Sequence, residues 1–106
     1  MEAKKYTLDK KDTLRVNGRK LSRIVALRDI PAAGVNKGDK GGYVASQDNL
    51  AHQGDCWVPQ TSIVHGAARI EGDVKIGFHA QIWSYAAHTI CVGVVADCAK
   101  LAFYVN

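Results

Sequence analysis

Four histidines are the residues of this 106-residue chain best suited to move a proton or to hold a metal ion. An imidazole can act as a general base near neutral pH, and imidazoles brought together can bind a transition metal. No paired carboxylate accompanies any of them, and their spacing does not require a metal, even in a trimer. We therefore expect surface or capping histidines, no catalytic residue and no metal site at His52, His65, His79 and His88.

The other reactive residue types also favour structural roles. Cys56, Cys91 and Cys98 are odd in number and lack a CxxC spacing, which argues against disulfides and zinc and favours buried, reduced thiols. The glycine-rich stretch Lys37–Gly42 lacks the order of a nucleotide-binding loop, so it predicts a turn that leads into a strand. No Ser/His/Asp arrangement has a usable local context. We expect no cofactor.

The composition is that of a soluble single domain with a basic first half. Hydrophobic residues make up 47% of the chain, no uncharged run suggests a membrane span, and no signal peptide opens it, so a cytoplasmic protein is expected. Residues 1–50 carry 11 Lys and Arg against 6 Asp and Glu. Acidic residues alternate with the basic ones and no aromatic ladder accompanies them, which argues against nucleic-acid binding. The modest core of so short a chain favours a homodimer or homotrimer.

Aliphatic residues occupy every sixth position through much of the second half of the chain. A second column, two positions earlier in each hexad, holds small or modest residues. Neither a helix nor a continuous alternating strand accommodates a strict period of six, which is typical of a hexapeptide-repeat β-helix. The aliphatic column is Val58, Val64, Ile70, Ile76 and Ile82, and the small column is Cys56, Ser62, Ala68, Val74 and Ala80.

The period of six predicts how the hexads stack. Each hexad makes one short strand and one corner, with the aliphatic side chain inside, and three hexads complete a turn. Val64 should therefore lie beneath Ile82 at the ordinary interstrand spacing. Gly66 and Gly72 should supply the backbone conformations of the corners. The register fails at His88, where an aliphatic residue is due, so we expect the coil to stop after about two turns.

Other elements are expected on either side of the hexads. Asn17-Gly18 between alternating segments predicts a β-hairpin, and no helix of normal length is expected in the first half. We divide the chain into a strand and hairpin cap (1–48), a β-helix (49–89) and an apolar C-terminal segment (90–106), all in one folding unit. The last segment fits a helix or one or two strands, and it should cap the coil or pack on a second subunit. The oligomer contacts expected there are Phe103, Tyr104 and Val105.

Six segments carry a likeness to known proteins: Lys5–Leu8, Val16–Arg19, Ile24–Asp29, Lys37–Val44, Asn49–Leu50 and Gly54–Val58. They resemble the small hexapeptide-repeat proteins of phages and prophages, and the likeness runs from residue 4 to about residue 84. The resemblance implies a β-strand cap followed by a short left-handed β-helix. Left-handed β-helix proteins include many acyltransferases, which use a histidine base at a subunit boundary, but this chain lacks the protruding loop that usually completes their acceptor pocket.

The function predicted on these grounds is non-enzymatic. We expect a protein–protein interaction protein of phage type, acting as a stoichiometric inhibitor of a host protein such as a component of antiviral defence. The alternatives are a CoA-dependent acyltransferase with His65 or His79 as base, and a structural virion or scaffold protein. An exposed tryptophan beside an aliphatic residue is a typical interface anchor, unless the hairpin or the C-terminal tail folds over it. The predicted partner-binding residues are Ile63, His65, Gln81, Trp83 and Trp57.

Overall fold

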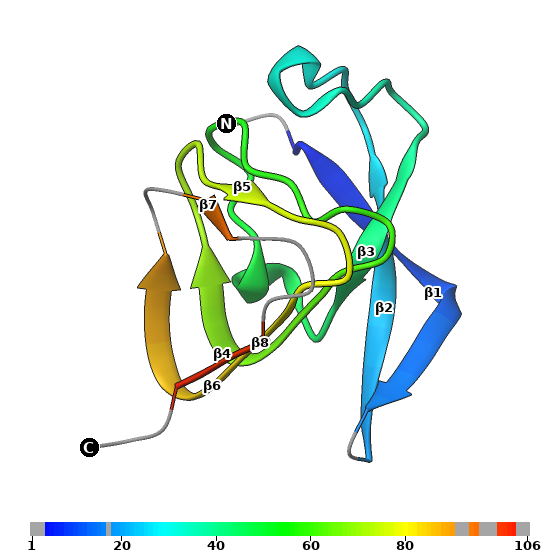
Figure 1. Cartoon of the computed structure of the whole chain (residues 1–106). Coiled ribbons are helices and arrows are strands. Elements are labelled where there is room, and N and C mark those ends of the chain that lie inside the picture. Colours follow the sequence, from blue (N-terminus) through cyan, green and yellow to red (C-terminus); the bar gives the residue numbers. More distant parts are fainter. Residues whose placement is uncertain (1–3, 17, 91–93, 96–99, 104–106) are drawn as a thin grey trace.

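The protein is mainly β, as predicted, and most of its strands belong to one mixed sheet (Figure 1). The computed structural model describes residues 4–16, 18–90, 94–95 and 100–103, with the side chains of 4–16 and 18–83. The sheet has the strand order β1-β2-β3-β4-β6-β8, and β5 pairs separately with β7. The strands are β1 (Tyr6–Val16), β2 (Arg19–Ala26), β3 (Lys40–Val44), β4 (Ile63–Ile70), β5 (Lys75–Ile76), β6 (Gln81–Ile90), β7 (Val94–Val95) and β8 (Lys100–Phe103).

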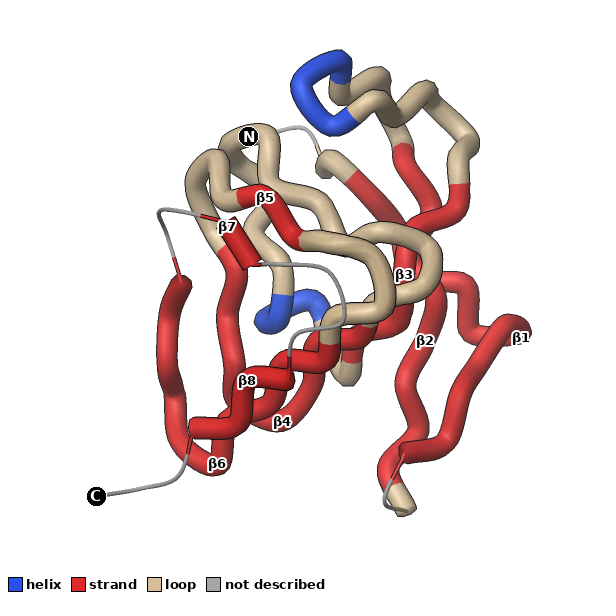
Figure 2. Tube along the Cα trace, viewed as in Figure 1, coloured by secondary structure: helices blue, strands red, loops and turns tan. Residues whose placement is uncertain are grey.

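Helices contribute little to the described residues. The two 3-10 helices, η1 (Pro31–Ala33) and η2 (Gln47–Asn49), are three residues each. They lie on the connections that precede and follow β3, as Figure 2 shows. Gly34 ends η1 in the left-handed conformation, with φ of 69°. In η2 the Ser46 hydroxyl accepts a hydrogen bond from the Asp48 N–H, which caps the helix start.

The predicted hairpin is confirmed. β1 and β2 pair antiparallel with Val16 opposite Arg19, which leaves a two-residue turn. Gly18 in this turn has φ of 78°, a conformation that glycine adopts without the penalty of a Cβ atom. The pairing register shifts between Asp9 and Thr13, so β1 carries a bulge midway along its length. The hairpin forms one edge of the sheet and extends away from the rest of the molecule (Figure 1).

The sheet changes from antiparallel to parallel at β3. This strand pairs antiparallel with β2 and parallel with β4. Its two glycines allow a close approach of the backbone, because a Cβ atom on Gly42 would collide with the carbonyl oxygens of Ser62 and Pro59. The Gly42 N–H donates instead to the Val58 carbonyl at 2.9 Å. The glycine-rich stretch therefore leads into a strand, as predicted, and its glycines serve packing.

Both predicted columns of the hexads form the core. All ten side chains are buried, with at most 8% of any of them exposed. Gly66 and Gly72 have φ of 68° and 73°, a conformation that glycine adopts readily and that a corner would require. The hydrophobic cluster made by these columns continues into Tyr6 and Ile24 of the first two strands. The N-terminal strands and the hexads thus share one core.

Residues eighteen apart lie side by side, as the period predicted. Val64 pairs with Ile82 in the parallel ladder of β4 and β6, and Trp57 forms a parallel bridge with Lys75. Polar contacts repeat at the same spacing, since the Asp55 N–H donates to Asp73 Oδ1 at 3.0 Å. The N–H groups of His79 and Ala80 likewise donate to the hydroxyls of Thr61 and Ser62. The register of the hexads was therefore predictable from the positions of the aliphatic residues alone.

The eighteen-residue register fails before His88, as predicted, but the pairing of β6 with β4 does not end there. Gly66 pairs with Ser84, eighteen residues later, and a shift of two residues follows between Gly66 and Ala68. Beyond it His88 pairs with Ala68 and Ile90 with Ile70, both at a spacing of twenty residues. The ladder therefore continues to Ile90 in a new register.

Parallel pairing also extends beyond β6. β7 pairs with β5, and β8 pairs with β6, with Leu101 opposite Ile82. The described residues of the C-terminal segment therefore lie in strands, which favours the strand alternative over the helix. Phe103 ends β8, but its side chain, Tyr104 and Val105 lie outside the described residues, so the oligomer contact through these three residues stays a prediction.

Candidate functional site

Three of the five predicted partner-binding residues are buried, so their expected exposure is wrong. Ile63 is 9% exposed and His65 is 5% exposed, and Trp57 is buried as well. Trp83 is partly buried and Gln81 is exposed. The prediction assumes that the residues just before and after each inward aliphatic point to solvent or to a partner protein. The sheet instead continues sideways through β3, which places Tyr43 beside Ile63. Trp57 shares the core with Val35 of the β2–β3 loop, defined as residues 27–39.

A polar network from the hairpin lies on the sheet next to Ile63. The Arg23 guanidinium sits 4.4 Å from the centre of the Tyr43 ring and donates to Asp12 Oδ2 at 2.6 Å and to the Gly41 carbonyl at 2.8 Å. The Tyr43 hydroxyl donates to Asp12 Oδ1 at 2.8 Å, and this bond, with Arg23, holds the pKa of the Asp12 carboxyl below its usual range. Both Asp12 oxygens are thus engaged, which fixes the bulge of β1 against the sheet.

His65 lies inside this sheet face and not at the surface. Its ring centre is 6.5 Å from that of Trp83, with the planes tilted by 50°. Its Nδ1 atom has no hydrogen-bond partner among the described residues. Burial lowers the pKa of His65, and the positive charge of Arg19 lowers it further. The neutral imidazole is therefore the favoured form, and its position is that of a core residue.

His52 fastens the start of the chain to the hexads. The Lys5 N–H donates to His52 Nδ1 at 3.1 Å, and the ring stacks on Tyr6 with 4.2 Å between centres. His52 Nε2 lies 2.9 Å from Gln47 Oε1, so the proton of the neutral ring belongs on Nε2. Burial and the positive charges of Lys5, Lys4 and Arg69 lower the pKa of His52. A capping role for this histidine, as predicted, agrees with these contacts.

The two lowered histidine pKa values predict a loss of stability in mild acid. In the unfolded chain a histidine titrates near pH 6.5, whereas folded His52 and His65 take up their protons at lower pH. The unfolded state thus binds more protons in this window, so the free energy of unfolding should fall as the pH drops from about 7 towards 5. Urea denaturation at several pH values measures this slope.

Two variants test whether His52 contributes to the pH dependence of the free energy of unfolding. His52→Asn keeps an acceptor near the Nδ1 position and removes the titrating group, so the loss of stability between pH 7 and 5 should become smaller. His79→Asn is the matched control, because His79 is exposed and has φ of 59°, which asparagine tolerates. An equal reduction in slope for both variants would contradict the role given to His52.

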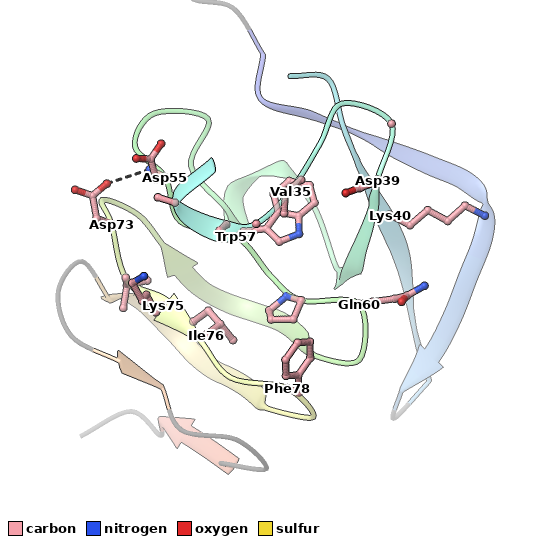
Figure 3. Close-up of a pocket in the computed structure, with 16 residues that line it drawn as sticks. Val35, Asp39, Lys40, Asp55, Trp57, Gln60, Asp73, Lys75, Ile76 and Phe78 are labelled. Carbon is pink, nitrogen blue, oxygen red and sulfur yellow. Dashed lines mark hydrogen bonds between the residues drawn. The ribbon is translucent and has the colours of Figure 1, made fainter. Parts of the chain in front are cut away.

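The candidate functional site is a groove between the β2–β3 loop and the hexads (Figure 3). Its volume is about 850 Å³, within the range of ligand-binding clefts. One wall comes from the loop, including Val35, and the other from two stacked levels of the hexads. The apolar lining includes Trp57, Pro59, Val74 and Ile76. The groove exists because the loop folds back across residues that a hexad alone would present to solvent.

Charged side chains of both signs surround this apolar floor. Figure 3 shows Asp55 and Asp73 together at one end, on adjacent levels of the stack, with Lys75 nearby. Lys40 and Gln60 lie towards the opposite side. An apolar floor with a polar rim is the usual anatomy of a binding surface, since the rim orients a ligand that the floor desolvates.

Phe78 is the lining residue that sequence reasoning missed. It follows β5 and is 59% exposed, the highest value among the large hydrophobic residues of the described part. It was detectable in principle, because it stands two residues after Ile76, at the position that Gly66 and Gly72 hold in the two preceding hexads. The loop that forms the opposite wall was predicted only as turns, and nothing local in the sequence says where it folds.

Comparisons with known proteins return no match, so the geometry of the site is the basis for its function. No family model matches the chain, and no curated protein matches it. Among the described residues, no helix reaches the length and apolar character needed to cross a membrane. In the same part of the chain, His, Cys, Asp and Glu side chains do not gather in groups of three or more that would hold a metal ion.

Proposed function

We propose that this protein is a non-enzymatic interaction protein that binds a partner polypeptide in the groove between the β2–β3 loop and the hexads. The observation that carries the proposal is Phe78, a largely exposed aromatic side chain at a groove floored by Trp57. Aromatic residues at the edge of a partly desolvated pocket are the usual anchors of protein interfaces. An apolar side chain of the partner would enter between Phe78 and Pro59.

The resemblance to phage and prophage proteins directs the proposal towards a host protein, such as a component of antiviral defence, which this protein would inhibit by stoichiometric binding. The charges at the groove suit a polypeptide, because Asp55 and Asp73 can pair with a basic side chain while Lys40 can pair with an acidic one. We also propose that the protein acts as a homodimer or homotrimer in the host cytoplasm.

We further propose that the stacked hexads form a short left-handed β-helix. The support is the parallel pairing at a spacing of eighteen residues, the burial of both hexad columns and the positive φ of the corner glycines. In this arrangement the β1–β2 hairpin and β3 form the cap at the first level. The wall of the coil then supplies one side of the groove.

The test is capture of a partner from host lysate with matched variants. Phe78→Ser should weaken binding by about 2 kcal/mol or roughly 30-fold in Kd, the range of an interface hot spot. Leu14→Ser is the control, because Leu14 is also an exposed hydrophobic residue but lies on the hairpin, outside the groove. Equal binding by both variants would remove the groove from the interface. A rise in melting temperature with acetyl-CoA would instead favour the acyltransferase.

A further inference from the structure

Lys5 is a fully buried lysine whose side chain points into the first level of the hexads. Its exposed fraction is 0%, and the hydrogen-bond acceptors around Nζ are the carbonyls of Cys56 at 2.6 Å and Gly54 at 3.4 Å, with Cys56 Sγ at 3.3 Å. In the described part of the chain no carboxylate forms an ion pair with it. Lysines are almost never fully buried without such a partner, so this position calls for an explanation.

The surroundings prepare the amine to act as a nucleophile. Burial lowers the pKa of Lys5, and the adjacent Cys56 opposes this shift without cancelling it. A lysine with a lowered pKa supplies more of the neutral amine, which is the reactive form. The distance of 3.3 Å between Nζ and Sγ lies within the range of a near-attack arrangement. Cys56 is itself fully buried, so its sulfur faces few competing nucleophiles.

We propose that Lys5 and Cys56 form an oxidative cross-linking site, in which a peroxide converts the Cys56 thiol to a sulfenic acid that condenses with the Lys5 amine. In the first step the peroxide O–O bond breaks, one oxygen is transferred to sulfur, and hydrogen peroxide is reduced to water. In the second step the Nζ lone pair attacks sulfur, an N–S bond forms, and the S–O bond breaks. Hydroxide leaves with a proton from the amine as a second water.

The product is a sulfenamide, and the chain has lost two hydrogen atoms. Two equivalents of a thiol reductant restore the amine and the Cys56 thiol and are themselves converted to a disulfide. The cross-link spans 51 residues and would tie the start of β1 to the first level of the hexads. Closing so long a loop restricts the unfolded chain, so the oxidised form should melt at a higher temperature. This site is independent of the groove and of the proposed binding function.

The experiment uses the full chain with Cys91→Ser and Cys98→Ser, which leaves Cys56 as its one thiol. The protein is incubated with hydrogen peroxide over hours, because the peroxide must reach Cys56 through local opening. Intact-mass and peptide analysis should show the loss of two hydrogens and a peptide that joins Lys5 to Cys56. Dithiothreitol should reverse the change, and the melting temperature should rise by several degrees before reduction.

Two variants separate the cross-link from other oxidation. Lys5→Met removes the amine and Lys5→Arg replaces it with a non-nucleophilic guanidinium, so either variant that folds should accumulate a sulfenic acid that dimedone traps. Cross-linking in the parent and trapping in the variant would support the site. Oxidation of Cys56 to sulfinic acid without a cross-link, a cross-link that retains the peroxide oxygen, or no mass change would each overturn the proposal.

Discussion

Replacing Gly42 with alanine should lower the free energy of unfolding by about 3 kcal/mol, the upper range for forcing an extra group into a packed site. The new Cβ would collide with two backbone carbonyls, those of Ser62 and Pro59, and neither belongs to a flexible side chain. Either β3 or the segment after Val58 must shift, which breaks the hydrogen bond from the Gly42 N–H to the Val58 carbonyl. Thermal denaturation should show the melting temperature falling by roughly 15 °C.

Gly34→Ala serves as the matched control for this steric effect. Nothing lies within 4 Å of a Cβ atom at Gly34, so the cost there comes from its φ of 69° alone and should be about 1 kcal/mol. The difference between the two variants measures the close approach of β3 to the hexads. If Gly42→Ala were no more destabilising than Gly34→Ala, the junction between the antiparallel and parallel halves of the sheet would be looser than described.

Replacing Tyr6 with alanine should destabilise the protein by about 4 kcal/mol, as expected for deleting a large buried aromatic ring. The side chain is fully buried, stacks on His52 and donates from its hydroxyl to the carbonyls of Leu50 and Gln47. Burial also raises the pKa of this hydroxyl, which keeps it a donor at all physiological pH values. Chemical denaturation measures the loss directly.

Two further substitutions separate the contribution of the Tyr6 hydroxyl from that of its ring and provide a control on the same strand. Tyr6→Phe removes only the hydroxyl and should cost about 1 to 2 kcal/mol, because buried carbonyls lose a donor. Thr7→Ala changes an exposed side chain on the same strand and should stay within about 0.5 kcal/mol. A Tyr6→Ala variant as stable as Thr7→Ala would show that the start of β1 does not anchor the hexads.

The parts of the fold that sequence reasoning found are those with a local or periodic cause. Asn17-Gly18 predicts its hairpin because few residues tolerate the turn conformation. The two columns of hexads predict the core and the pairing of Val64 with Ile82 because the period of a stacked chain is a property of the chain itself. Neither inference needs to know which distant segments meet.

The parts that escaped prediction depend on distant contacts. A lysine is ordinarily expected in solvent, so nothing in the sequence indicates that Lys5 is buried. Only the folded chain shows that a thiol and two carbonyls surround its amine. His65 and Ile63 are expected at the surface, because nothing in the sequence of a hexad indicates that β3 will pair with β4. The groove forms only because the β2–β3 loop folds over Trp57. The turn residues of this loop predict its local shape but not which distant segment it contacts.

The spacing between paired residues varies along the parallel ladder. Tyr43 pairs with Ile63, twenty residues later, Val64 pairs with Ile82 after eighteen, and Ile82 pairs with Leu101 after nineteen. Insertions of one or two residues are thus accommodated between strands, whereas a single Cβ atom at Gly42 would collide with the carbonyls of Ser62 and Pro59. We therefore expect this fold to tolerate changes in the lengths of its connections better than exchanges of the residues that pack its walls. Its loops are then free to acquire new partners while the same core is retained.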